Sequence, residues 1–268
     1  MDISETAYAK INLALHVRRR REDGYHELET LFAFVDAGDV LRVTNGAPET
    51  LAVTGEFADA AGPLEANLAW RALKLWEARF PLHVELEKRL PVAAGLGGGS
   101  ADAAAIIRVL RRFRGAAQGI APEAIASLGA DVPACVLSRT HIGRGTGAQQ
   151  HAVEDDLAGA PVLLVNPRIP LSTGPVFKAW DGVDRGALPG GSARAIALAG
   201  RNDLEAPAIS LCPAIAAVLA ALRATGPVLA RMSGSGATCF ALYRNAEARD
   251  AAQASMRPEW WTLAGALR

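Results

Sequence analysis

The stretch Leu90-Pro91-Val92-Ala93-Ala94-Gly95-Leu96-Gly97-Gly98-Gly99-Ser100-Ala101-Asp102-Ala103-Ala104 places four glycines within five positions, directly before a run of helix-forming residues. Glycine adopts backbone angles that other residues avoid, and it has no side chain to keep a ligand away from the backbone. The free N–H groups and the dipole at the start of a helix attract phosphate. The stretch therefore predicts a phosphate-binding loop followed by a helix. A glycine-rich tight turn without a ligand is the alternative.

Two common phosphate-binding motifs do not fit this loop. A P-loop requires the spacing G-x-x-x-x-G-K-[ST], and no lysine follows these glycines. A dinucleotide-binding fingerprint requires a third glycine where Ser100 stands, and an acidic residue about 20 residues further on. No such acid occurs where the chain continues from residue 117. Neither motif therefore accounts for the loop, and the tight turn without a ligand remains the alternative.

Composition limits the class of protein. The 268 residues suffice for one large domain or two medium ones, and half of them are apolar, which allows a sizeable core. The formal net charge is zero, so the basic excess of a nucleic-acid-binding protein is missing. The one basic block, residues 18–21, is predicted to be a solvated turn. We expect no nucleic-acid partner.

The cysteines and the N-terminal sequence predict a cytoplasmic protein. Cys135, Cys212 and Cys239 are odd in number and widely spaced, and no zinc-binding spacing occurs. This pattern suits a reducing compartment. The N-terminus lacks the basic start and apolar core of a signal peptide, and no run of about 18 apolar residues occurs. We therefore expect no membrane association.

The first segment is predicted to form a hairpin. Residues 7–17 alternate, with Ile11 and Leu13 on the core face and Lys10 and Asn12 on a polar face that solvent could cover. Asp23-Gly24 predicts the turn, and residues 25–35 the returning strand.

A lysine stands out in the strand that precedes the glycine-rich loop. Helical spacing over residues 67–80 is followed by a strand over residues 84–90, in which Lys88 shares the phase of Val84, Leu86 and Leu90. A lysine in an apolar phase is costly unless it is partnered or reaches water. Lys88 is therefore a candidate ligand contact, and an internal ion pair is the alternative.

The helix after the loop carries one acid, and a second acid lies further along the chain. Ser100 is predicted to cap this helix, which runs to about Arg114 with Ile107, Leu110 and Phe113 buried. Asp102 in the first turn suits the helix dipole but would repel bound phosphates unless a metal ion bridged them. Asp131, among small and apolar residues, is either a cap or a site residue.

The second half is predicted to be a separate domain. The composition turns polar and acidic over residues 148–160, so we place the boundary at residue 155, with domains at 1–155 and 156–268. Strands are expected at 162–166, 238–243 and 260–263, and helices at 213–224 and 246–256. A second glycine-rich loop, residues 232–238, has the composition of a plain turn and allows close backbone approach.

Three blocks of the sequence resemble a known family. The loop matches the GHMP kinase pattern P-x-x-x-G-L-G-S-S-A-A at Pro91, Gly95, Leu96 and Gly97. Its Gly98-Gly99-Ser100 variant resembles one branch, the kinase of the non-mevalonate isoprenoid pathway that phosphorylates a hydroxyl of a cytidine-diphosphate-linked methylerythritol. The segments Ala9-Lys10-Ile11-Asn12-Leu13 with Asp23-Gly24-Tyr25-His26-Glu27-Leu28, Gly129-Ala130-Asp131-Val132-Pro133, and Ser233-Gly234-Ser235-Gly236-Ala237-Thr238 also resemble that branch, in the same order.

The resemblance implies an α+β fold with an N-terminal domain like that of ribosomal protein S5 and a C-terminal ferredoxin-like domain. It implies ATP and Mg²⁺ as cofactors, a substrate with a cytidine diphosphate group, and a monomer or weak homodimer. Lys10 and Asp131 resemble the catalytic pair, and the metal ligands are unassigned. Substrate binding is implied for Asn12, Tyr25, His26, Thr173 and Phe177. ATP binding is implied for Asn67, Leu68, Lys88, Pro91, Val92, Ala93, Ala94, Gly95, Leu96, Gly97, Gly98, Gly99, Ser100 and Ala101.

Some positions depart from the branch. Arg19 replaces a usual glycine, Ala148 replaces a usual glutamate, and Ala93 and Ala94 replace glycines sometimes found before Gly95. The alternatives are another GHMP kinase, of the homoserine or mevalonate type, and a nucleotide-binding sensor on the same fold. A homoserine or mevalonate kinase has no evident use for a base-stacking pair at Tyr25 and His26. A nucleotide-binding sensor would be expected to lack Lys10 or Asp131.

Overall fold

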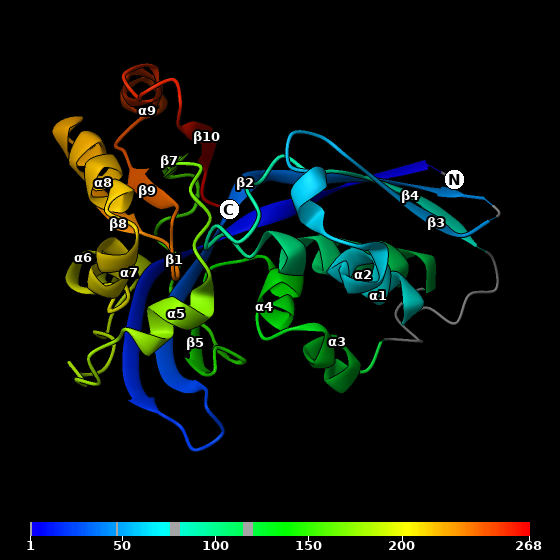
Figure 1. Cartoon of the computed structure of the whole chain (residues 1–268), viewed down its shortest axis with the longest axis horizontal. Coiled ribbons are helices and arrows are strands. Elements are labelled where there is room, and N and C mark those ends of the chain that lie inside the picture. The colour runs from blue at the N-terminus through cyan, green and yellow to red at the C-terminus, as the bar shows by residue number, and fades with distance from the viewer. Residues whose placement is uncertain (1, 47, 76–80, 115–119) are drawn as a thin grey trace. The chain divides into compact units, whose positions relative to one another are not determined.

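The computed structural model describes residues 2–46, 48–75, 81–114 and 120–268 (Figure 1). The chain folds into two compact units. The first unit comprises Met1–Ala9, Gly38–Val92 and Gly97–Leu137, and the second Lys10–Ala37, Ala93–Leu96 and Ser138–Arg268. Neither unit is a single stretch of chain, because the long strands β1 (Asp2–Arg20) and β2 (His26–Asn45) contribute to both. The domain boundary at residue 155 stays a prediction.

The first unit has helices along one side of a small sheet. The C-terminal half of β2 pairs with β4 (Leu82–Glu87), which pairs in parallel with β3 (Thr50–Thr54). Helix α1 packs along α2, and α2 packs on α4 (Figure 1). The helices are α1 (Leu68–Lys74), α2 (Gly98–Arg114), α3 (Pro122–Leu128) and α4 (Val132–Leu137), with 3₁₀ turns at η1 (Asp59–Ala61) and η2 (Leu64–Ala66).

The second unit contains a four-stranded antiparallel sheet in the order β10-β7-β9-β8. Helix α8 packs on β8 and β9, and α9 packs on β7 and β10 (Figure 1). The N-terminal half of β2 pairs with β5 (His141–Gly145), which pairs with β6 (Gln149–His151). The other elements are β7 (Pro161–Asn166), α5 (Thr173–Lys178), α6 (Ala193–Ala199), α7 (Glu205–Leu211), α8 (Ala214–Ala224), β8 (Leu229–Met232), β9 (Cys239–Leu242), α9 (Ala246–Ala254) and β10 (Trp261–Ala266).

The predicted α+β fold is confirmed, and several element boundaries differ from expectation. The first strand continues to Arg20, so Arg18 is not in a turn but pairs with Asp184 at 2.9 Å. The helix predicted from residue 67 begins at Leu68 and ends at Lys74, and residues 76–80 lie outside those described. In α2, Ile107 and Leu110 are buried as predicted. The side chain of Phe113 is not among those described.

A buried arginine fastens β8 to β1 within the second unit. The Arg231 guanidinium donates to the carbonyl oxygens of Leu13, Ala197 at 2.9 Å and Gly200 at 2.6 Å. Burial lowers its pKa to about 10, which still leaves it charged at neutral pH. Because three backbone acceptors depend on one side chain, Arg231 fixes the part of β1 that follows Asn12.

We predict that Arg231→Lys destabilises the protein although the charge is kept. The compact ammonium group of lysine cannot reach all three carbonyls that the planar guanidinium group reaches. At least one buried carbonyl therefore loses its partner, which lowers the free energy of unfolding by about 1–3 kcal/mol. Thermal unfolding measures the loss. Arg223→Lys, at an exposed arginine on α8, is the matched control and should leave the midpoint nearly unchanged. Equal midpoints for the two variants would contradict the prediction.

Candidate active site

The glycine-rich loop ends in the first turn of α2, in the first unit. The N–H of Ala101 donates to the carbonyl of Gly97 at 2.8 Å, the first helical hydrogen bond. The N–H groups of Gly98, Gly99 and Ser100 therefore have no acceptor within the helix. Gly97 has a positive φ of 62°, which favours glycine. This arrangement presents backbone donors and the positive end of a helix dipole, as phosphate binding requires.

Ser100 lies inside this first turn, because α2 begins at Gly98. The prediction that Ser100 caps the helix is therefore wrong: glycines without side chains already form the helix start. No capping side chain covers the backbone N–H groups of Gly98 and Gly99. A ligand can therefore approach them more closely than it could approach a capped helix start.

The middle of the same loop, Ala93–Leu96, belongs to the second unit and lies against the second glycine-rich loop. The Ser233 hydroxyl donates to the carbonyl of Gly95 at 2.9 Å, and the N–H of Thr238 donates to the carbonyl of Ala94 at 3.2 Å. A Cβ on Gly95, whose φ is 76°, would lie 2.4 Å from the carbonyl oxygen of Ser233. The residue must therefore be glycine, and the second loop packs closely against the first.

Lys10 is fixed beside this part of the loop. Its N–H donates to the carbonyl of Leu96 at 3.0 Å. Its ammonium donates to Asn12 Oδ1 at 3.1 Å and lies 5.0 Å from the ring centre of Phe32. Lys10 is only 5% exposed. The strand face that solvent could have covered is thus buried and holds an oriented ammonium group.

Asn12 links Lys10 to both neighbouring segments of the second unit. Its N–H donates to the Ser233 hydroxyl at 3.2 Å, and its Nδ2 donates to the Thr30 hydroxyl at 2.7 Å. Asn202 Nδ2 donates to the carbonyls of Met232 and Gly234, both at 2.8 Å, which holds the second loop in place. Asn12 therefore orients Lys10.

Asp131 lies directly before α4, in the first unit. Its carbonyl accepts from the N–H of Cys135 at 3.0 Å, so it begins the helix, and its side chain is half-buried. Leu68 lies between this region and the glycine-rich loop of residues 91–101 (the phosphate loop). A Cβ on Gly99 would lie 3.7 Å from Leu68 Cδ1, and a Cβ on Gly129 would lie 3.9 Å from the same atom. The pairing of Asp131 with Lys10, which is in the other unit, stays a prediction.

Two residues predicted to contact ATP have structural partners. The Asn67 side chain accepts from the N–H of Ala69 at 2.9 Å and caps α1. Lys88 is 3% exposed, and its ammonium donates to Asp39 and, at 2.7 Å, to Asp102. The prediction that Lys88 lies on the buried face of its strand segment is confirmed. Its ammonium group forms ion pairs inside the protein. Contacts of Asn67 and Lys88 with a nucleotide stay predictions.

Of the predicted substrate residues, His26 and Phe177 lie together in the second unit. The ring of His26 lies 4.8 Å from that of Phe177 and 5.7 Å, edge-on, from that of Trp180. Within the described part of the chain, the buried Nε2 of His26 has no hydrogen-bond partner. Burial, with the nearby charge of Arg20, lowers the pKa of His26, so the ring is neutral near pH 7. Tyr25, by contrast, is 64% exposed. A neutral, unpaired ring nitrogen is suited to read the edge of a base.

The sequence analysis did not single out Trp180, and it quoted Ser233 and Ser235 within a family-like block without assigning them a role. Trp180 follows α5, and a single tryptophan after a short helix gives no functional signal by itself. Ser235 forms a hydrogen bond with Thr173, the first residue of α5, at 2.9 Å between hydroxyl oxygens. The glycines around Ser233 and Ser235 were the available signal, since they allow the close approach that the hydroxyls then use.

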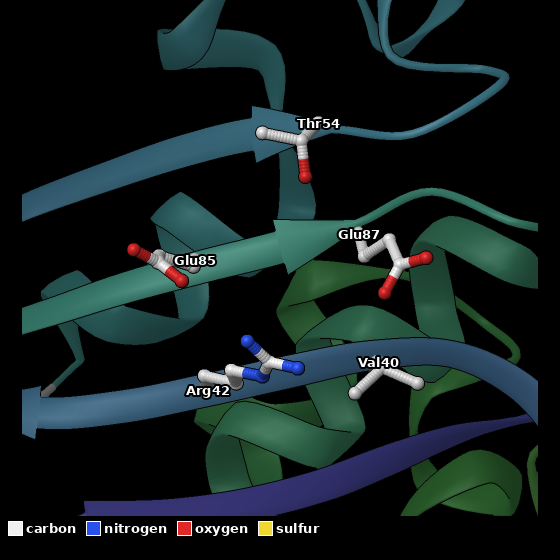
Figure 2. Close-up of a pocket in the computed structure, with 5 residues that line it drawn as sticks. All are labelled: Val40, Arg42, Thr54, Glu85 and Glu87. Atoms are coloured by element: carbon white, nitrogen blue, oxygen red, sulfur yellow. The ribbon is translucent and has the colours of Figure 1, made fainter.

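A shallow pocket of about 80 Å³ lies elsewhere, on the first unit's sheet, lined by Val40, Arg42, Thr54, Glu85 and Glu87 (Figure 2). Glu87 is followed at once by Lys88, but Lys88 is buried and does not line this pocket, since side chains alternate along the chain. None of the predicted site residues lines it.

The described residues contain no group of three or more His, Cys, Asp or Glu side chains that could hold a metal ion. A magnesium ion brought by a nucleotide keeps several waters and phosphate oxygens as ligands and needs only one or two from the protein. The backbone N–H groups at the start of α2 suit the phosphates of such a nucleotide and are not ligands for the ion itself. No helix in the described ranges is long and apolar enough to cross a membrane.

Comparison with known proteins agrees with this arrangement. The family model for the GHMP kinases N terminal domain matches residues 67–143, and that for GHMP kinases C terminal matches residues 187–262. A 4-diphosphocytidyl-2-C-methyl-D-erythritol kinase of Novosphingobium aromaticivorans is 64% identical over 268 residues, covering 100% of this chain and 94% of that protein. This chain belongs to the 4-diphosphocytidyl-2-C-methyl-D-erythritol kinase family of the GHMP kinases.

Further relatives extend the similarity. The 4-diphosphocytidyl-2-C-methyl-D-erythritol kinase of Erythrobacter litoralis is 57% identical over 273 aligned residues, covering 99% of this chain and all of that protein. A crystal structure of a 4-(cytidine 5'-diphospho)-2C-methyl-D-erythritol kinase has a TM-score of 0.78 at 35% identity and covers 99% of both chains. A homoserine kinase structure from Cytophaga hutchinsonii, at 17% identity and a TM-score of 0.71, shares the fold.

We predict that Gly99→Ala weakens nucleotide binding without loss of stability. The added Cβ has only an ordinary contact with Leu68, at 3.7 Å, and alanine favours a helix by up to about 1 kcal/mol over glycine. The same methyl group would stand where phosphate must approach the backbone. Calorimetric titration with ATP measures the affinity, and thermal unfolding serves as the control. Unchanged affinity in the folded variant would exclude this backbone from the nucleotide site.

Proposed function

We propose that this chain transfers the γ-phosphoryl group of ATP to the 2-hydroxyl of 4-diphosphocytidyl-2-C-methyl-D-erythritol. The observation that carries the proposal is the placement of Lys10. Its ammonium group is buried and oriented by Asn12, and its N–H is hydrogen bonded to Leu96 of the phosphate loop. The family membership, at 64% identity to a relative of that name, supports the choice of substrate.

The proposed chemistry uses positioning and charge. Phosphoryl transfer needs little covalent work from the protein, because the reacting oxygens must mainly be aligned and their charge neutralised. In the proposal, Asp131 accepts or orients the proton of the attacking hydroxyl, and Lys10 stabilises the charge on that oxygen or on the transferred group. The family's nucleotide, ATP, would bring Mg²⁺ to neutralise its phosphates. The ligands of that ion among the protein residues are not assigned.

The substrate's base is proposed to bind at His26. Phe177 and Trp180 hold the neutral imidazole ring, and Nε2 is left to pair with a polar edge of cytosine. Exposed Tyr25 supplies a flat face for stacking, and Thr173 and Asn12 help to place the rest of the substrate. A homoserine or mevalonate kinase would have no evident need for this arrangement. Cytoplasmic location and a monomeric or weakly dimeric state stay predictions from the sequence.

The function is tested directly by measuring ADP release with three acceptors: 4-diphosphocytidyl-2-C-methyl-D-erythritol, homoserine and mevalonate. We expect turnover with the first alone. Turnover with homoserine or mevalonate instead would favour the other GHMP kinases, and nucleotide binding without turnover on any acceptor would favour a sensor.

We predict that Tyr25→Ala weakens substrate binding by about 1–3 kcal/mol, the usual contribution of one aromatic ring stacked on a base. ATP affinity should barely change. Titration calorimetry with each ligand separates the two effects. Tyr25→Phe is the matched control, since it keeps the ring and should keep most of the affinity. A comparable loss for both ligands would point to general disruption instead.

We predict that Asp131→Asn keeps both ligands bound and lowers kcat by about 10²-fold or more, as expected for one positioned acid–base group. Steady-state kinetics measures kcat, and calorimetry confirms binding. Glu123→Gln, at an exposed carboxylate on α3 in the same unit, is the control and should turn over normally. Wild-type turnover in the Asp131→Asn variant would remove Asp131 from the proposed mechanism.

A further inference from the structure

The buried carboxylate of Asp102 lies in the second turn of α2, which begins at Gly98, and not in the first turn as the sequence predicted. Asp102 Oδ2 accepts from the Lys88 ammonium at 2.7 Å, and none of the described residues forms a hydrogen bond with its buried Oδ1. Asp102 follows Gly98 by four residues, so it lies one helical turn below the backbone that faces a phosphate. An ionised carboxylate there would repel a polyphosphate, and the surrounding charges decide how strongly.

A second buried carboxylate, that of Asp39, fixes the segment between β4 and the glycine-rich loop. Asp39, on β2, accepts with Oδ1 from the N–H groups of Arg89 at 2.6 Å and Leu90 at 2.8 Å. Its Oδ2 accepts from the Lys88 ammonium. Because Pro91 follows immediately, Asp39 fixes the point at which the chain enters the loop. Lys88 thus joins β2, the end of β4 and the second turn of α2.

This cluster lies directly under the loop. A Cβ on Gly98 would be 3.6 Å from Lys88 Nζ and 3.7 Å from Asp39 Oδ2. One ammonium faces two carboxylates, so the cluster is neutral only when one carboxyl group is protonated. Burial, against the attraction of Lys88 and together with the charge of Asp39, raises the pKa of Asp102 to about 8. Although burial opposes its charge, the carboxylates of Asp102 and Asp39 hold the pKa of Lys88 above its ordinary value.

Other charged groups on the packed elements have their own partners or lie at the surface. Arg89 pairs with Glu87 at 2.8 Å in the exposed region, and Arg108, further along α2, pairs with Glu5 at 2.6 Å. On α1, Lys74 pairs with Glu49 and Arg71 is exposed, and Asp131, before α4, is half-buried. The balance at Asp102 is therefore set mainly by Lys88 and Asp39.

We propose that Asp39, Lys88 and Asp102 form a brace that positions the phosphate loop, and that binding of a polyphosphate to the loop completes the protonation of Asp102 with a proton from solvent. This inference rests on the proposed binding of ATP by the same loop. The negative phosphates favour the neutral brace, so binding and protonation reinforce one another. Lys88 then acts on the nucleotide through the loop, as a positioning residue.

The proposal is tested by calorimetric titration of the full chain with ADP near pH 8, in two buffers that differ in ionisation enthalpy. We expect the wild-type protein to take up a fraction of a proton on binding. From pH 7 to pH 9 its affinity for ADP should fall about tenfold, the order expected for one unit charge several ångströms from the phosphates. Asp102→Asn, which fixes this position in a neutral form, should abolish the uptake and flatten the pH dependence.

A second variant guards against misfolding of the first. Asp39→Asn leaves one carboxylate for one lysine, so Asp102 should ionise at lower pH and the uptake near pH 8 should again be lost. Glu85→Gln, at an exposed carboxylate on β4, is the control and should behave as wild type. Proton uptake that persists in the folded Asp102→Asn variant would overturn the inference while leaving the proposed function intact. Failure of the wild-type protein to bind ADP would instead count against the nucleotide site itself.

Discussion

The close approach of two glycine-rich loops is the constraint on which the arrangement of the candidate site residues within the second unit depends. A side chain at Gly95 would collide with the carbonyl of Ser233, and the Ser233 hydroxyl donates to the carbonyl of Gly95. The same hydroxyl accepts from the N–H of Asn12, whose side chain orients Lys10. One serine thus ties the phosphate loop, the first strand and the catalytic candidate together. Glycine permits the contact, and hydrogen bonds to a buried backbone make its disruption costly.

The buried side chains of Lys88 and Arg231 have partners that stabilise their charges. In the first unit, Lys88 balances two carboxylates beneath the loop. In the second unit, the guanidinium of Arg231 is satisfied by backbone carbonyls alone, next to the strand that carries Asn12. Buried charges are strongly destabilising when one partner is removed, so these groups restrict how far the neighbouring backbone can move. A phosphoryl-transfer site benefits from such rigidity, because its catalysis is mainly positioning.

Part of the site was predictable because its signal is local. The glycine spacing predicted a loop followed by a helix, and α2 begins within that run, at Gly98. The period of two around Val84 and Leu86 placed Lys88 in the buried phase, as found. The capping role assigned to Ser100 was wrong because a glycine-rich stretch can itself begin a helix. Trp180 and Ser235 were given no role, because their contacts are with His26 and Thr173, which are distant in sequence.

The sequence by itself determined the class of this protein, because its glycine-rich loop and three further blocks are local motifs that resemble those of the GHMP kinases. Tertiary structure decided which side chains share an environment. Only folding showed that Lys88 faces both Asp39 and Asp102, that His26 packs on Trp180, and that the second glycine-rich loop supports Lys10 through Asn12. Those contacts join residues from 14 to 221 positions apart, and no local pattern encodes which distant partner a buried polar group will find.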